Sequence, residues 1–235
     1  MELQWIGQAG YYFRTSQGTH IMIDPYLSDS LVQVKGPRFT RQVPIQEALF
    51  KAPLDMLVLT HNHDDHTNLA TLDILLDRPP INVIAPPAVC QLLLNRYGSG
   101  HNYIFATPGW EFTEKDVLLK ATFAAHSDPE AIGITLEADG LTLCHTGDTL
   151  FHRAVLQDLP RNADALFFPI NGVGNNMNCS DALRLVRQLT PKTIYPMHWE
   201  MFGYYGCPVE NFTSLLTQEE LDRVRIPSHY CWVAL

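Results

Sequence analysis

The chain has 235 residues, of which 46% are hydrophobic, and it carries a formal net charge of −9 with only 16 lysines and arginines. This size and composition allow one large domain, spanning residues 1–235, to bury a substantial core. The shortage of basic side chains argues against nucleic acid as a partner, because gripping a phosphate backbone requires clustered lysines and arginines.

Short strands separated by turns are expected at the start of the chain. The runs ELQWI, YYFRT and HIMID are rich in aromatic and β-branched residues, which is typical of a meander of three strands. Residues 25–53 contain four prolines and no sustained periodicity. We therefore expect a long loop there, with one short helix near residues 45–50.

Further along, strands alternate with helices. Strands are expected at LDMLVLT, INVIAP and NYIFAT, with helices near residues 69–77 and 87–97. The strands LLKATFAAH, AIGITLEA and LTLCHT come next, and the last two are joined by an Asp-Gly turn at residues 139–140 that signals a hairpin. ALFFPI, a helix near residues 180–189 and TIYPMH return to the alternating pattern. This order predicts an α/β fold in which two sheet-rich halves face each other.

A cluster of histidines and aspartates follows the strand LDMLVL. It has the pattern H-x-H-x-D-H and consists of His61, His63, Asp65 and His66. Alternate residues of an extended segment point the same way, so His61 and His63 can bind one ion while Asp65 and His66, past a bend, face a second. Imidazole and carboxylate ligands suit zinc, manganese or iron.

Three further candidate ligands lie far along the chain. His126, Asp148 and His198 each follow an apolar, strand-like run. The carboxyl ends of such strands are where α/β sheets place their sites. Taken alone, His126 or His198 is more simply an ordinary hydrogen-bonded histidine, but the cluster makes a metal site the better interpretation.

Simpler roles compete for several polar residues near the cluster. Asp64 or Asp65 could cap the helix that starts near residue 69. Asp24 could orient a ligating imidazole or stabilise the turn before Pro25. His145 is more simply a packed or supporting histidine than a ligand. The remaining histidines, for which surface or structural roles are the default, are His20, His101, His152 and His229.

Four motifs together resemble a known superfamily. H-N-H-D-D-H, A-A-H-S, H-T-G-D-T and P-M-H-W-E-M-F, in that order, are similar to those of the metallo-β-lactamase-fold hydrolases, from the first strand to about residue 216. The segments L-Q-W-I-G-Q-A-G, I-D-P, A-I-G-I-T, P-I-N-G and H-W-E-M-F resemble most the L-ascorbate-6-phosphate lactonase branch.

The resemblance implies a four-layer αββα sandwich with the site at one edge between the sheets. It also implies two divalent ions, zinc or manganese with iron possible, and the branch favours manganese. One ion would be held by His61, His63 and His126. The other would be held by Asp65, His66 and His198, with Asp148 bridging the two.

A centre of this kind performs hydrolysis without a serine or cysteine nucleophile. Two cations about 3.5–4 Å apart lower the pKa of a shared water and stabilise an oxyanion. Asp65 could orient the water or move a proton in addition to serving as a ligand. The leading hypothesis is hydrolysis of a lactone or ester in a small, phosphorylated, sugar-derived metabolite. A phosphodiesterase and a metal-binding module without turnover are the alternatives.

An anionic substrate would require hydrogen-bond donors near the ions. The candidates are the basic residues of the long loop, the asparagines of NGVGNN and the tyrosines after the last motif. We select Arg38, Asn171, Asn175 and Tyr204, and keep Lys35, Arg41, Asn176 and Tyr205 as further candidates. Solvated loop side chains and a flexible turn are the simpler interpretation of each one alone.

The five cysteines are odd in number and widely spaced, and none forms a C-x-x-C pair. This pattern predicts no disulfide framework and favours a reducing, cytoplasmic location. The N-terminal residues include no basic leader followed by an apolar stretch, and nowhere do about 18 apolar residues run together. We therefore expect an unsecreted protein without membrane contact, and the composition is compatible with a homo-oligomer.

Overall fold

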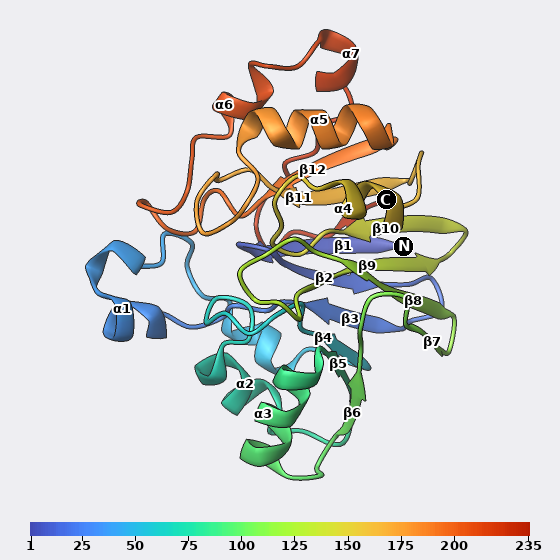
Figure 1. Cartoon of the computed structure of the whole chain (residues 1–235). Coiled ribbons are helices and arrows are strands. Elements are labelled where there is room, and N and C mark those ends of the chain that lie inside the picture. The colour runs from blue at the N-terminus through green and yellow to red at the C-terminus, as the bar shows by residue number, and fades with distance from the viewer.

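The computed structural model describes all residues, 1–235, and shows two β-sheets facing each other with helices on the outer faces (Figure 1). The strands of the first sheet are β1 (Glu2–Gly7), β2 (Gly10–Arg14), β3 (His20–Ile23), β4 (Met56–Val58), β5 (Asn82–Ala85), β6 (Asn102–Phe105) and β13 (Val233–Ala234). Those of the second are β7 (Glu111–Glu114), β8 (Val117–Phe123), β9 (Ile132–Ala138), β10 (Leu141–His145), β11 (Ala165–Pro169) and β12 (Thr193–Met197).

Most of the helices are short. The α-helices are α1 (Ser30–Lys35), α2 (Leu69–Leu75), α3 (Pro87–Tyr97), α4 (Arg153–Asp158), α5 (Cys179–Leu189), α6 (Glu210–Thr213) and α7 (Gln218–Leu221). Two 3-10 helices, η1 (Pro37–Phe39) and η2 (Glu47–Lys51), lie in the long segment between β3 and β4. None of the helices has the length and apolar character that a membrane crossing requires.

Alternation along the strands explains the layers. In β3, Ile21 and Ile23 face the other sheet, whereas Met22 faces the helices outside. In β11, Phe167 points into the same central core and Phe168 points outward. The core between the sheets contains 23 buried residues and the two outer cores contain 17 and 15, so both sheets are covered on both faces. The predicted four-layer αββα sandwich is confirmed.

Strand direction determines where the site can form. The first sheet has the order β13-β1-β2-β3-β4-β5-β6, and the second has the order β12-β11-β10-β9-β8-β7. β3 and β4 are parallel, β10, β11 and β12 are parallel, and β8 and β10 are both antiparallel to β9. The carboxyl ends of parallel strands meet at one edge of a sheet. The loops that follow β4, β8, β10 and β12 therefore converge.

The expected elements are present, and the helix predicted near residues 45–50 is η2. The structure adds short elements that the sequence analysis did not predict: α1, η1, β7, α4, α6, α7 and β13. Elements of two to six residues are too short to establish a periodicity. β13, for example, exists only because Val233 and Ala234 pair with Leu3 and Glu2 of β1.

Candidate metal centre

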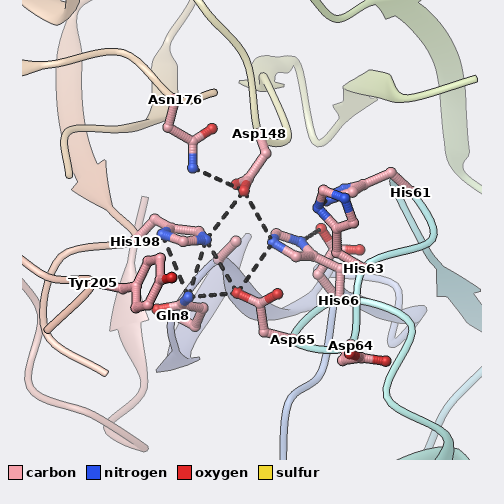
Figure 2. A network of polar contacts seen from close by, with 12 residues as sticks. Gln8, His61, His63, Asp64, Asp65, His66, Asp148, Asn176, His198 and Tyr205 are labelled. Atoms are coloured by element: carbon pink, nitrogen blue, oxygen red, sulfur yellow. Dashed lines mark hydrogen bonds and ion pairs between the residues drawn. The ribbon is translucent and has the colours of Figure 1, made fainter. Parts of the chain in front are cut away.

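The seven predicted ligands lie together at the converging edge, where Figure 2 shows six of them by name. They come from four loops. His61, His63, Asp65 and His66 follow β4, His126 follows β8, Asp148 follows β10, and His198 directly follows β12. The loop after β4 is a series of bends, so the expectation that His61 and His63 share a face of an extended segment is wrong. The bends nevertheless bring the two rings together.

One group consists of three histidines. His61 Nε2 lies 3.0 Å from His63 Nδ1, and His126 Nε2 lies 3.1 Å from the same atom. All three ligand atoms are within 4.8 Å of one another. Ligands bound at about 2.0–2.2 Å in a tetrahedron are separated by roughly 3.3–3.6 Å. The three nitrogens therefore fit around one ion after small adjustments.

The other group consists of Asp65, His66 and His198, whose ligand atoms also lie within 4.8 Å of one another. Asp65 Oδ2 is 3.2 Å from His198 Nε2 and 3.8 Å from His66 Nε2. Mixed nitrogen and oxygen ligation of this kind suits zinc, manganese and iron. These two sets of residues are the ones that the resemblance implied, and a third set within the same reach, Asp24, His61 and His66, joins them.

Asp148 lies above the second group and is 4% exposed. Its Oδ2 is 3.1 Å from His198 Nε2 and 3.4 Å from His66 Nε2 (Figure 2). Asp148 Oδ1 and His66 Nε2 are both buried without a hydrogen-bond partner. Buried polar atoms are rarely left unpaired, because losing water without replacement costs free energy. A divalent cation would satisfy both atoms, so the residues present fit a metal ion.

Protonation differs between the two groups. Burial holds the pKa of His61 well below its usual value, and burial also lowers the pKa of His126. These rings are therefore neutral at pH 7, and neutral imidazole is the form that binds a metal. The charge of Asp148 opposes the shift in both histidines, so the carboxylate of Asp148 is close enough to act on this group as well.

Charge attraction dominates in the second group. Burial disfavours the charged forms of Asp148 and His198, but each stabilises the charge of the other. The pKa of Asp148 consequently lies well below its usual value, and the pKa of His198 rises to about 10.

Asp24 orients one of the candidate ligands from behind. His66 Nδ1 donates to Asp24 Oδ2 at 2.7 Å, which leaves His66 Nε2 directed toward Asp65 and Asp148. Asp24 also accepts the Thr60 N–H at 2.8 Å and the Thr60 hydroxyl at 2.5 Å. This fully buried carboxylate already accepts three hydrogen bonds, so we assign it the task of holding the imidazole of His66.

Gln8 is a residue of the centre to which the sequence analysis assigned no role. Its amide Nε2 donates to Asp65 Oδ2 at 2.7 Å and lies 3.0 Å from His198 Nε2. The backbone N–H of Gln8 donates to Glu200 Oε1 at 2.7 Å. The signal that could have revealed it is a polar residue in the tight turn between two apolar strands, next to a glycine.

The backbone is strained at this edge. Nine non-glycine residues have a positive φ, and four of them lie here: Gln8 at 55°, Asp24 at 44°, Asn175 at 62° and His198 at 59°. Such conformations cost roughly 1–3 kcal/mol each and persist where the surrounding structure imposes them, most often at functional sites. The left-handed backbone at Gln8 and His198 accompanies the approach of their side chains, whose Nε2 atoms lie 3.0 Å apart.

The structure also shows what Asp64 and His145, two polar residues near the centre, contact. Asn68, and neither Asp64 nor Asp65, caps α2 by accepting the Thr71 N–H, so that interpretation of the two aspartates is wrong. Asp64 instead pairs with Lys35 at 2.7 Å and points away from the centre (Figure 2). His145 is buried, with Nε2 2.8 Å from the Ala9 carbonyl oxygen, and is a packed histidine.

A pocket of about 460 Å³ opens onto the candidate ligands. Only four of its 15 lining residues are hydrophobic, which suits a small polar ligand. Arg38, Asn171 and Asn175 line it as predicted, and Lys35 and Asn176 do too. Tyr205 lines the pocket, whereas Tyr204, which is 65% exposed, does not.

The basic residues of the long loop differ in how they are engaged. Arg41 is structural, because its guanidinium donates to the Tyr230 hydroxyl at 2.8 Å and to the Val43 carbonyl at 2.5 Å. Arg38 is exposed and forms no hydrogen bond or ion pair. Its guanidinium lies 5.4 Å from the ring centroid of Tyr204 and 5.9 Å from that of Tyr205. Its donors are therefore free at the pocket.

The loop before α5 supports the ligands that come from the second sheet. Asn176 Nδ2 donates to Asp148 Oδ2 at 2.8 Å, and the Asn175 carbonyl oxygen lies 3.2 Å from His126 Nδ1. Asn171 Nδ2 donates to the Tyr205 carbonyl oxygen at 3.0 Å, while Asn171 Oδ1 is buried and unpaired. Asn175 and Asn176 therefore orient candidate ligands, and Asn171 joins two walls of the pocket.

The chain resembles known proteins in both sequence and structure. The family profile described as Beta-lactamase superfamily domain matches residues 19–199. A UPF0173 metal-dependent hydrolase of Myxococcus xanthus is 31% identical over 216 residues, which cover 86% of this chain and 71% of the relative. One from Pyrococcus furiosus is 24% identical over 234 residues and 93% of each chain.

Solved structures share the fold at lower sequence identity. The metallo hydrolase Igni18 of Ignicoccus hospitalis superposes with a TM-score of 0.79 at 21% identity, covering 99% of this chain and 97% of that one. An isothiocyanate hydrolase from Delia radicum gut bacteria superposes with a TM-score of 0.80 at 18% identity, covering 100% and 99%. At this identity the likeness shows the architecture alone.

Proposed function

This chain belongs to the β-lactamase superfamily and to its UPF0173 metal-dependent hydrolases, and we propose that residues 1–235 form one hydrolase domain acting on a lactone or ester of a small anionic metabolite. The observation that carries the proposal is the polar pocket in which free donors of Arg38 lie across from the two groups of candidate ligands. The resemblance of its sequence segments to the L-ascorbate-6-phosphate lactonase branch favours a phosphorylated sugar lactone as the substrate.

We assign two ions to the centre. His61, His63 and His126 would hold one, and Asp65, His66 and His198 would hold the other, with Asp148 between them. When bound, two divalent cations would supply a water of lowered pKa and neutralise the charge that develops on a carbonyl oxygen. The mixed ligand set suits zinc, manganese or iron, and the lactonase likeness favours manganese.

The side chains around the ions would have distinct tasks. Asp65 and Asp148 are the carboxylates among the candidate ligands, and both line the pocket, so they would orient an attacking water by accepting its hydrogen bonds, and Asp65 would carry a proton away. Gln8 donates to Asp65 and thereby keeps one carboxylate oxygen directed toward His198. Asp24 fixes the ring of His66 with Nε2 facing Asp65 and Asp148.

Substrate binding would use the opposite wall. The guanidinium of Arg38 can bind a phosphate or carboxylate with two parallel hydrogen bonds, and its packing on aromatic rings limits the entropy lost in doing so. Lys35 also lines the pocket, but Asp64 neutralises part of its charge. Asn171 also lines the pocket, where its amide would shape the wall beside the substrate.

A phosphodiesterase is the second candidate, because Asp148 links two ligand groups that could clamp the attacking and leaving oxygens of a phosphoryl transfer. The two activities are distinguished by a screen with zinc, manganese and iron supplied in turn. We expect phosphorylated sugar lactones to be opened and bis-p-nitrophenyl phosphate to be spared. The reverse result would favour the phosphodiesterase.

Metal content gives an independent test. We expect His63→Ala to lose bound metal and activity together while the fold survives, because the residue lies at the edge of the sheets and outside the core. Elemental analysis and circular dichroism measure both properties. His152→Ala, an exposed histidine outside the centre, is the control. A protein that holds two metal equivalents yet leaves every lactone, ester and phosphodiester intact would support a binding module instead.

A further inference from the structure

Two thiols from distant parts of the chain meet beside the pocket. Cys179 is the first residue of α5, and Cys207 lies in the segment after β12. Both sulfurs contact the same acceptor, the Ile170 carbonyl oxygen, at 3.6 Å from Cys179 and 3.3 Å from Cys207. Both residues are half-buried, so small molecules can reach them.

Cys179 has the features of a reactive thiol. The N-terminus of an eleven-residue helix stabilises a negative charge on its sulfur. The neighbouring Cys207 thiol lowers the pKa of Cys179 to about 7, against the opposing effect of burial. By contrast, burial raises the pKa of Cys90 to about 11 and that of Cys144 to about 12. Cys179 is therefore the nucleophile of the pair and Cys207 its neighbour in position to react next.

We propose that Cys179 and Cys207 form a reversible redox pair that closes into a disulfide when a peroxide oxidises Cys179. The Cys179 thiolate attacks one oxygen of hydrogen peroxide, which gives a sulfenic acid and releases hydroxide. The Cys207 sulfur then attacks the Cys179 sulfur and expels the sulfenic oxygen as water. In total, two thiols and one peroxide give one disulfide and two waters.

The disulfide would join the bases of two loops that line the pocket. The loop between β11 and α5 carries Asn171 and Asn176, and the segment from β12 to Cys207 carries His198 and Tyr205. Two side-chain hydrogen bonds already link them, from Asn171 to the Tyr205 carbonyl oxygen and from the Cys207 sulfur to the Ile170 carbonyl oxygen. Oxidation would thus restrict two walls of the pocket without touching a candidate ligand.

The first test counts thiols and locates the bond in the full-length, zinc-loaded protein. After treatment with one equivalent of hydrogen peroxide, we expect the five thiols of each chain to fall to three and dithiothreitol to restore them. Tryptic digestion without reductant should yield one linked species joining peptide 162–184 to peptide 193–223. The linkage should be lost in Cys179→Ser and in Cys207→Ser. It should persist in the control Cys231→Ser, which removes an exposed cysteine.

Two outcomes would overturn the proposal. One is a disulfide between the Cys231 residues of two chains with the pair left reduced. The other is a sulfinic acid on Cys179 without any linked peptide. Amide hydrogen exchange measures whether the disulfide restricts the two walls of the pocket. The amides of residues 171–178 and 199–207 should exchange more slowly after oxidation. Unchanged exchange rates would contradict the proposed restriction.

A second measurement needs no disulfide and uses the reduced protein. With iodoacetamide at pH 7, Cys179 should be labelled before Cys231, and Cys207→Ala should slow its labelling by about fivefold as the thiolate fraction falls. Circular dichroism establishes that the variant is folded, and labelling sites in the unmodified protein are mapped on the same tryptic peptides. An unchanged rate would show that Cys207 does not activate Cys179.

Discussion

The loop after β4 and the loops after β8, β10 and β12 supply the same candidate centre in different ways. The first contributes four candidate ligands within six positions and holds itself in place. The hydroxyl of Thr67 donates to the His61 carbonyl oxygen at 2.7 Å, and its N–H donates to the His63 carbonyl oxygen at 2.7 Å. These bonds shape the main chain of the turn locally, while Asp24 and Gln8 orient the side chains of His66 and Asp65.

The other three loops contribute one ligand each and depend on partners from elsewhere. Asn176 braces Asp148, Asn175 contacts His126, and the His198 N–H donates to the Gln8 carbonyl oxygen at 3.2 Å. The difference shows that the main chain of one half of the centre is shaped largely within one segment, whereas the other half depends on the assembled sheets. Substitutions in the two halves should therefore have different consequences.

The largest effect is expected where the halves meet. Asp148 contacts His66 of the local turn and His198 of the distant loops, so Asp148→Asn, which keeps the shape and removes the charge, should lower kcat by about 10³-fold or more. Steady-state kinetics and elemental analysis measure the loss. Asp222→Asn, an exposed aspartate, is the control. Activity within tenfold of the unmodified protein would show that Asp148 does not link the two ligand groups.

A smaller effect is expected from removing a brace of the distant half. Asn176→Ala leaves Asp148 without its side-chain donor, and loss of such a supporting contact typically costs about 10–100-fold in metal affinity or activity. Metal titration followed by activity measurement tests this, with the exposed Asn95→Ala as control. Unchanged metal affinity would show that the loops after β8, β10 and β12 do not depend on partners from elsewhere in the chain, contrary to the difference described above.

Substrate anchoring lies outside both halves, in the loop that contains η1. Arg38→Ala should raise KM for a phosphorylated substrate by about tenfold while leaving the unphosphorylated analogue nearly unchanged, because one charge-assisted contact is lost. Arg153→Ala, also exposed, serves as the control. Equal changes for the two substrates would mean that Arg38 does not recognise the anion.

The smallest kinetic effect is expected from the cap of the local turn. Asn68 accepts the Thr71 N–H and donates to the Asp64 carbonyl oxygen at 2.8 Å, so Asn68→Ala should cost about 2 kcal/mol of stability. The Tm should then fall by roughly 4–8 °C. We expect kcat of the metal-loaded protein to change less than about threefold, because bound ions hold the turn in place. A large loss of kcat at an unchanged Tm would reverse the assignment of Asn68 to folding.

The order of the main strands and helices could be predicted because it depends on local patterns. In β3, for example, the alternation of inward Ile21 and Ile23 with outward Met22 can be recognised from consecutive residues. The ends of α3 can likewise be recognised from the prolines before it and the glycine after it. Short elements such as β13 could not be predicted, because two residues in a strand have no pattern of their own and depend on β1 as a partner.

The candidate centre, too, could be predicted from the sequence only in part. By itself, the sequence determined the residue types, the local cluster and the position of each distant candidate at the end of a strand, since these follow from spacing. Only the tertiary structure decided that Gln8 reaches Asp65, that Asp24 stands behind His66, and that Tyr205 rather than Tyr204 faces the pocket. Side-chain direction at a bend or a left-handed residue depends on contacts with segments far along the chain, and those contacts exist only after the two sheets have packed.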